Sequence, residues 1–246
     1  HAVGNGGTIH AVPYLDDHED PQSLAEQARL LDAKLVYFAN PDNPMGSWHA
    51  ADTVQGLIDN LPRSCLLVLD EAYIDLAPSG TALDLLPETD NVIRLRTFSK
   101  AYGMAGARVG YAIGPKSLMT AFEKMRNHFG LSRISQAGAL AALHDQAYVA
   151  EIKEKVAKSR ATLAQIAKDN GLTSLPSATN FVTIDCGGDG DFAGKVLEQM
   201  IARAVFVRMP AVAPMNRCIR ISCGAEDAMA LVAKTLPEAL KAARAS

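Results

Sequence analysis

Residues 66–73 read LLVLDEAY, four apolar residues followed at once by two acids. The apolar run does not alternate with polar residues, which is typical of a central parallel strand covered on both faces. In open α/β sheets, ligands bind outside the carboxyl ends of the strands. The stretch therefore predicts a buried strand that brings Asp70 to the ligand-binding edge of a sheet.

Apolar runs alternate with segments of helical periodicity on both sides of this stretch, an order typical of strand-helix-strand units. We expect strands at residues 8–12, 34–38, 64–69, 92–96 and 108–113, and helices at residues 22–31 and 50–61. The run 108–113 is also expected to be a central parallel strand. The predicted class is α/β, with a mostly parallel central sheet and helices on both faces.

The second half of the chain changes pattern. Residues 116–168 have helical character with a break near Gly130, and Gly171 and Pro176 then mark a turn region. Further on, we expect strands at residues 181–184, 205–207 and 218–222, and helices at residues 192–203 and 227–243. The pattern predicts a large domain over residues 1–148 and a smaller C-terminal α+β domain over residues 149–246.

The composition excludes several classes of protein. The chain has 24 basic and 27 acidic residues and no block of like charge, so it lacks the electrostatic footprint of a nucleic-acid or membrane-surface protein. No apolar run approaches the roughly 18 residues of a membrane span, and a signal-peptide pattern is absent, so we expect a cytoplasmic location. The four cysteines and the histidines lack metal-ligand or disulfide spacing, so no metal is expected. The expected partners are small molecules and other protein chains.

Three strand ends carry polar motifs. Residues 40–46 read NPDNPMG, residues 70–73 read DEAY, and residues 97–100 read TFSK, followed by Arg108. Taken singly, each motif has a structural explanation as a turn, a helix cap or a solvated lysine. Taken together, an amine beside hydroxyls and a guanidinium suits a ligand with a phosphate and a carbonyl that the amine can condense with. Pyridoxal 5'-phosphate is such a ligand.

Two residues would carry the chemistry of this cofactor. Lys100 would form the Schiff base and would later act as general acid and base when a substrate displaces it. Asp70 would pair with the pyridinium nitrogen and keep it protonated, which makes the ring an electron sink.

The remaining motif residues would hold the cofactor. Asn43 and Tyr73 are neutral donors suited to the phenolate oxygen of the ring. Thr97, Ser99 and Arg108 would bind the phosphate, the arginine through a charge-assisted fork.

The motifs NPDNPMG, DEAY and TFSKAYGMAGARVGY, in this order and spacing, resemble those of the fold type I pyridoxal-phosphate aminotransferases, most of all the histidinol-phosphate aminotransferase branch. The resemblance covers nearly the whole chain. It implies the same roles for Lys100, Asp70, Tyr73, Asn43 and Arg108. It also implies a homodimer, because active sites of this family are completed across a subunit interface.

Two further residues are candidates for substrate binding. Residues 217–224 (RCIRISCG) resemble the RIxxG strand of the family, whose arginine binds the substrate carboxylate, and this implies that role for Arg220. Strand alternation places Ile219 and Ile221 on the opposite face from Arg220. Arg217 lies outside the match and is the weaker candidate. Asn180, in a segment that resembles a substrate-proximal part of the family, is a further candidate.

The sequence departs from the family pattern at two places. Met45 stands where the family usually has threonine, which puts one loop hydrogen bond in doubt. The chain also starts after the N-terminal segment that supplies a phosphate-binding loop in the family. We therefore expect an N-terminal part of the large cofactor-binding domain to be missing.

The predicted function is a pyridoxal-phosphate-dependent aminotransferase that moves an amino group between an amino acid or a histidinol-phosphate-like amine and a 2-oxo acid in a ping-pong cycle. One alternative with the same cofactor is a decarboxylase or lyase such as threonine-phosphate decarboxylase. A second alternative is the aminotransferase-like sensor domain of a transcription regulator.

Overall fold

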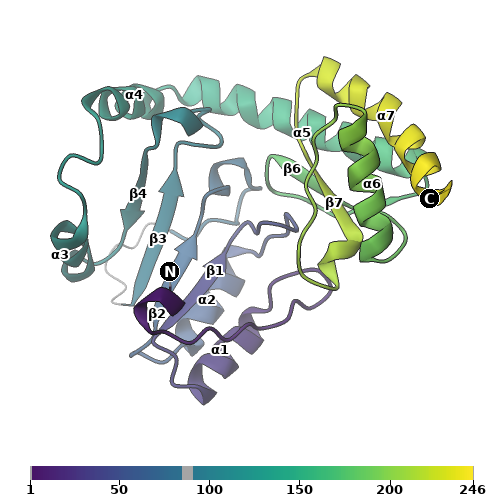
Figure 1. Cartoon of the computed structure of the whole chain (residues 1–246). Helices are drawn as coiled ribbons and strands as arrows, with labels where there is room; N and C mark the ends of the chain where they lie inside the picture. Colours follow the sequence, from purple (N-terminus) through teal and green to yellow (C-terminus); the bar gives the residue numbers. More distant parts are fainter. Residues whose placement is uncertain (1, 85–90, 246) are drawn as a thin grey trace.

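The computed structural model describes residues 2–84 and 91–245 (Figure 1). Its strands form two sheets, one with the order β1-β2-β3-β4 and one with the order β5-β6-β7. The predicted α/β class with a mostly parallel sheet is confirmed. The division into domains at residue 148 stays a prediction.

The larger sheet brings three carboxyl ends to one edge. β1 (Leu35–Ala39), β2 (Leu66–Asp70) and β3 (Val92–Thr97) run parallel, with Ala39 opposite Asp70 and Asp70 opposite Leu95. β4 (Gly110–Ile113) pairs antiparallel with β3, so the expectation of a central parallel strand at 108–113 is wrong. A parallel connection needs a crossover, whereas residues 98–109 form an irregular loop with the short helix η3 (Ala105–Ala107).

Helices α1 (Pro21–Leu30) and α2 (Ala51–Asn60) cover one face of this sheet. Apolar residues of both helices and of the first strands form the core there: Ala25, Ala28, Val36, Phe38, Val54, Leu57, Leu67 and Leu69. The intervening residues point to the other face, where the side chains of Leu35 and Tyr37 are more than half exposed. Asp70 belongs to this more open face.

Three helices connect the two sheets. α3 (Lys116–Met125), α4 (Arg133–His144) and α5 (Gln146–Asp169) confirm the helical stretch and its break near Gly130. α5 is the long helix that spans the molecule towards the second sheet in Figure 1. The predicted domain boundary falls inside its first turn.

The smaller sheet is antiparallel and contains β5 (Thr173–Ser174), β6 (Phe181–Asp185) and β7 (Cys218–Ser222). Helices α6 (Gly190–Ala202) and α7 (Glu226–Ala245) enclose a core with it, which includes Leu163, Ile184, Met200, Ile219 and Leu236. The remaining 3₁₀ turns are η1 (Val3–Asn5), η2 (Ile74–Leu76) and η4 (Met215–Arg217).

Two expected strands are not formed. Residues 8–12 are irregular and pair with no described strand, and residues 205–207 pass only into an isolated bridge between Arg208 and Arg220. Strand propensity alone does not make a strand without a neighbouring edge to pair with.

Within residues 2–84 and 91–245, no helix has the length and apolar character needed to cross a membrane. The same residues contain no group of histidine, cysteine and acidic side chains placed to hold a metal ion. The four cysteines are free thiols, of which Cys65, Cys186 and Cys218 are buried.

Candidate active site

The ends of neighbouring strands bring the predicted lysine and tyrosine together. Tyr73 follows β2 in the DEAY motif, and Lys100 follows β3. The Lys100 Nζ atom lies 4.9 Å from the centre of the Tyr73 ring. Tyr73 is buried and Lys100 is half-buried. The amine is therefore held against a fixed aromatic surface while still accessible to a ligand.

A chain of contacts runs from Tyr73 to the second sheet. The Phe181 ring of β6 meets the Tyr73 ring edge-on, with 5.5 Å between the ring centres. On the neighbouring strand β7, Arg220 Cζ lies 4.6 Å from the centre of the Phe181 ring. Arg220 Nη1 also donates a hydrogen bond to Asn43 Oδ1. Arg220, the predicted substrate-binding residue, thus lies beside Asn43, which is predicted to contact the cofactor ring. Phe181, which the sequence did not indicate, connects Arg220 to Tyr73.

The Asp70 carboxylate is held from two sides. Its Oδ1 atom accepts a hydrogen bond from Ala72 N at 2.9 Å, and its Oδ2 atom accepts one from the Tyr37 hydroxyl at 2.5 Å. Burial and the hydrogen bond to Asp70 raise the pKa of Tyr37 well above its usual range, so the hydroxyl stays a donor. Sequence reasoning did not find Tyr37.

Two of the three predicted phosphate residues lie together at the end of β3. Thr97 Oγ1 lies 3.0 Å from Ser99 Oγ and accepts a hydrogen bond from Ser99 N at 3.1 Å. Arg108 is exposed, has a φ of 52°, and donates from Nη1 to Ala105 O at 2.8 Å. The binding of phosphate by these residues stays a prediction.

The loop that carries Asn43 is fixed by the buried carboxylate of Asp42. Asp42 Oδ1 accepts from the Tyr14 hydroxyl at 2.9 Å, and Oδ2 accepts from Met45 N at 2.9 Å. Met45 itself is buried, with 1% of its surface exposed. The sequence put one loop hydrogen bond in doubt because Met45 replaces the usual threonine. In the structure the main-chain N–H of Met45 donates a hydrogen bond within the loop, and its side chain packs in the core.

The same loop packs closely against the second sheet. Thr183 Oγ1 donates to Pro44 O at 2.7 Å. Gly46 has a φ of 86°, and a Cβ atom there would lie 2.7 Å from Ser177 Oγ. Only glycine fits both this backbone conformation and this approach. The contact between the sheets therefore positions Asn43 close to Arg220.

A second carboxyl group lies at the end of β1. Glu19 Oε2 accepts a hydrogen bond from Ala39 N at 3.1 Å. Burial, and after it the negative charge of Asp42, raises the pKa of Glu19 to about 8. Asp70 contributes to the same rise. No sequence motif points to Glu19. Its carboxyl group is close to the site, and its charge changes near pH 8.

Arg217 is separate from the site. It donates from Nη2 to Asp17 Oδ2 and from Nε to Asp185 Oδ2, both at 2.7 Å. This bridge joins the N-terminal segment to the second sheet and occupies the guanidinium. Asn180 is half-buried, and its main-chain carbonyl accepts from Cys223 N. A contact of its side chain with substrate stays a prediction.

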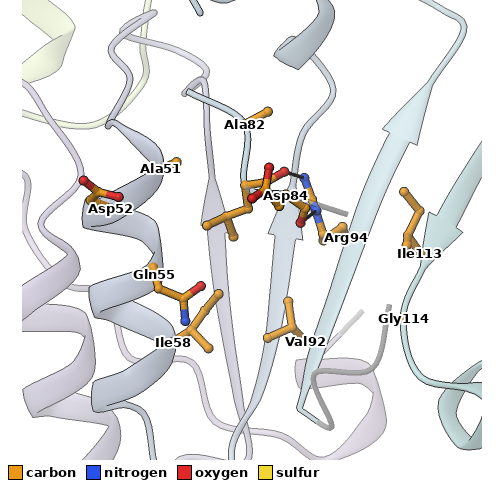
Figure 2. Close-up of a pocket in the computed structure, with 11 residues that line it drawn as sticks. Ala51, Asp52, Gln55, Ile58, Ala82, Asp84, Val92, Arg94, Ile113 and Gly114 are labelled. Carbon is orange, nitrogen blue, oxygen red and sulfur yellow. Dashed lines mark hydrogen bonds between the residues drawn. The ribbon is translucent and has the colours of Figure 1, made fainter. Parts of the chain in front are cut away.

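A pocket of about 210 Å³ lies between α2 and β3 (Figure 2). Arg94, which lines it, is opposite Leu69 in the strand register, so the pocket lies on the other face of the sheet from Asp70. Its charged centre is Arg94, which is 4% exposed and donates from all three guanidinium nitrogens. Glu71 accepts hydrogen bonds from Arg94 and from Arg96, so it points away from Asp70 and has a structural role. Among the described residues that line this pocket, the one cation, Arg94, is fully engaged in hydrogen bonds, so the pocket is not the predicted site.

Residues 2–236 match the family described as aminotransferase class I and II. The chain belongs to this family. It is 34% identical to a histidinol-phosphate aminotransferase of Geobacillus sp. (strain WCH70), over 98% of this chain and 66% of that protein. It is 37% identical to a histidinol-phosphate aminotransferase of Bacillus pumilus (strain SAFR-032), over 86% of this chain and 58% of that protein.

A solved histidinol-phosphate aminotransferase from Sinorhizobium meliloti, in complex with pyridoxal-5'-phosphate, superimposes with a TM-score of 0.95 at 48% identity. The match covers 98% of this chain and 66% of that one. The chain thus spans somewhat less than two thirds of the length of the curated relatives it matches. The threonine phosphate decarboxylase of Porphyromonas gingivalis, at 20% identity and a TM-score of 0.71, shares the fold alone. The predicted resemblance to the aminotransferase family is confirmed.

Proposed function

We propose that this protein is a pyridoxal-phosphate-dependent aminotransferase. One observation carries the proposal: a lysine amine stands 4.9 Å from the centre of a buried tyrosine ring, beside strand ends that supply a carboxylate and two hydroxyls. The names of the relatives, and the cofactor in the Sinorhizobium meliloti structure, support the same cofactor here.

The donor set fits the cofactor chemically. Lys100 would hold its aldehyde end, Asp70 its ring nitrogen, and Asn43 and Tyr73 its ring oxygen. The hydroxyls at Thr97 and Ser99 with the exposed guanidinium of Arg108 would hold its phosphate. When bound, the cofactor supplies an electron sink for the bond that breaks at the substrate α-carbon.

The protein's own residues then bind, orient and move a proton. Arg220 would bind the carboxylate of an amino acid or 2-oxo acid, since its Nη1 already reaches the Asn43 side chain at the site. The Lys100 Nζ atom would take the proton from the substrate α-carbon and deliver it to the former aldehyde carbon of the cofactor, on the other side of the nitrogen that is transferred. Tyr73 restricts where this amine can move, because its buried ring faces Nζ.

The experiment uses the full-length protein with added pyridoxal phosphate. We expect a visible absorption band that disappears on addition of histidinol phosphate or glutamate and returns with a 2-oxo acid, together with a keto product. Lys100→Ala should lose this turnover while it keeps the fold, and Lys195→Ala, at an exposed lysine of α6, should behave like the parent. A Lys100→Ala protein that transaminates normally would disprove the assignment.

A second variant tests the electron sink. Asp70→Asn removes the negative charge opposite the ring nitrogen, and we expect a loss of roughly 10²-fold in rate.

The reaction products distinguish the alternative functions. Release of carbon dioxide in place of keto acid would favour the decarboxylase alternative. A band that persists with every amine would favour the sensor alternative.

The expected homodimer is consistent with the exposure of large apolar side chains on α3, on α4 and in the segment between them: Phe122, Met125, Phe129, Ile134 and Leu140. Where exposed apolar side chains gather into a patch, they mark an interaction site. Light scattering of the full-length protein should give twice the chain mass, and Ile134→Glu should reduce it. The cytoplasmic location stays a prediction, which cell fractionation would test.

A further inference from the structure

Tyr37 reaches the site from β1, the strand next to the one that ends in Asp70. In the parallel register, Tyr37 lies opposite Val68 and Ala39 lies opposite Asp70. Tyr37 and Asp70 therefore project from the same face of the sheet, one strand apart. The Tyr37 hydroxyl donates to Asp70 Oδ2 at 2.5 Å.

This hydrogen bond complements the one from the main chain. Ala72 N holds Oδ1 at 2.9 Å, so the two donors together fix the plane of the carboxylate. A hydrogen bond from a hydroxyl to a carboxylate is short and about twice as strong as one between neutral groups. The raised pKa of Tyr37 keeps the donor proton in place over the working pH range.

Packing does not explain this tyrosine. Its side chain is 53% exposed, and it belongs to none of the hydrophobic clusters of the described residues. The neighbouring residues Val36 and Phe38 supply the buried contacts of β1. The hydroxyl is therefore the part of Tyr37 that the structure uses.

We propose that Tyr37 is a positioning residue that holds the Asp70 carboxylate in the orientation required to pair with the ring nitrogen of the cofactor. The inference rests on the function proposed above. It assigns to β1 a contribution that the known motifs do not contain. Because Tyr37 acts through Asp70, its effect must disappear when that carboxylate is removed.

The test is a double-mutant cycle on cofactor affinity. Pyridoxal phosphate is titrated into full-length parent, Tyr37→Phe, Asp70→Ala and the double variant, and binding is followed by absorption. We expect Tyr37→Phe to raise Kd about tenfold, the low end for a charged hydrogen bond, with kcat reduced as well. In the Asp70→Ala background, Tyr37→Phe should change Kd by less than twofold.

Tyr111→Phe is the matched control. Tyr111 lies on β4 opposite Arg96, whose Nε contacts Glu71 on the other face of the sheet, and the substitution should leave Kd unchanged. A Tyr37→Phe protein with parental Kd, or an equal loss in the Asp70→Ala background, overturns the inference. A parent that does not bind the cofactor overturns the proposed function itself, so the two failures are distinguishable.

Discussion

Replacing Glu19 by glutamine should stabilise the cofactor-free protein at alkaline pH. The Glu19 carboxyl lies at the end of β1, where it accepts from Ala39 N and is flanked by the carboxyl of Asp42. Burial and that neighbouring charge raise its pKa from an ordinary 4.5 to about 8. Glutamine keeps the acceptor for Ala39 N and carries no charge at any pH.

The predicted gain in stability at alkaline pH follows from proton linkage. The folded state binds the Glu19 proton more tightly than the unfolded state, so this group's favourable contribution is complete below pH 4.5 and is lost as the pH rises through about 8. The interval between the two pKa values corresponds to at most about 5 kcal/mol, at 1.36 kcal/mol per pH unit. Because the side chain is partly exposed, we expect a gain of about 2 kcal/mol for Glu19→Gln at pH 9.

Urea unfolding from pH 5 to pH 9 measures this difference. The free energies of unfolding of parent and Glu19→Gln should diverge from pH 5 to about pH 8 and differ by a constant amount above that pH. Glu26→Gln, at an exposed position on α1, should run parallel to the parent. If the parent and Glu19→Gln curves stay parallel over the whole range, the reasoning is refuted.

Three further predictions concern the contacts around the loop and the second sheet. Gly46→Ala should destabilise the protein by about 2 kcal/mol in thermal or urea unfolding. The backbone φ of 86° is unfavourable for alanine, and the new Cβ would lie 2.7 Å from Ser177 Oγ. An unchanged free energy of unfolding would contradict this prediction. Arg217→Gln leaves its two partly buried carboxylate partners without a counter-charge, and should cost about 2 kcal/mol in urea unfolding. In Arg220→Lys the lysine lacks the planar pair of donors with which arginine binds a carboxylate, so we expect KM for the 2-oxo acid to rise about tenfold while cofactor affinity stays parental. An unchanged KM would show that Arg220 does not bind the substrate. The lysine ammonium can still donate a hydrogen bond to Asn43, so we expect Arg220→Lys to fold normally.

The strand ends could be predicted because apolar runs and the polar residues after them are local features. β2 was predicted as residues 64–69 and spans Leu66–Asp70, and β7 was predicted as residues 218–222 and spans the same residues. The direction of β4 could not be predicted from its own composition. A run of apolar residues fits an antiparallel strand equally well, and the path of the preceding loop decides.

The unpredicted site residues share one property, which is that their role depends on contacts between segments far apart in the chain. Phe181 acquires its role only when β6 docks beside Tyr73. Glu19 acquires a raised pKa only when Asp42 approaches it. Tyr37 looks like an ordinary strand residue until its register against β2 places it beside Asp70.

The proposed aminotransferase function is tested most directly by identifying the lysine that binds the cofactor. The full-length protein is incubated with pyridoxal phosphate, reduced with sodium borohydride, digested and sequenced by mass spectrometry. We expect one stable pyridoxyl adduct, on the peptide that contains Lys100, and none on Lys100→Ala. An adduct on a different lysine, or the same labelling in Lys100→Ala, would contradict it.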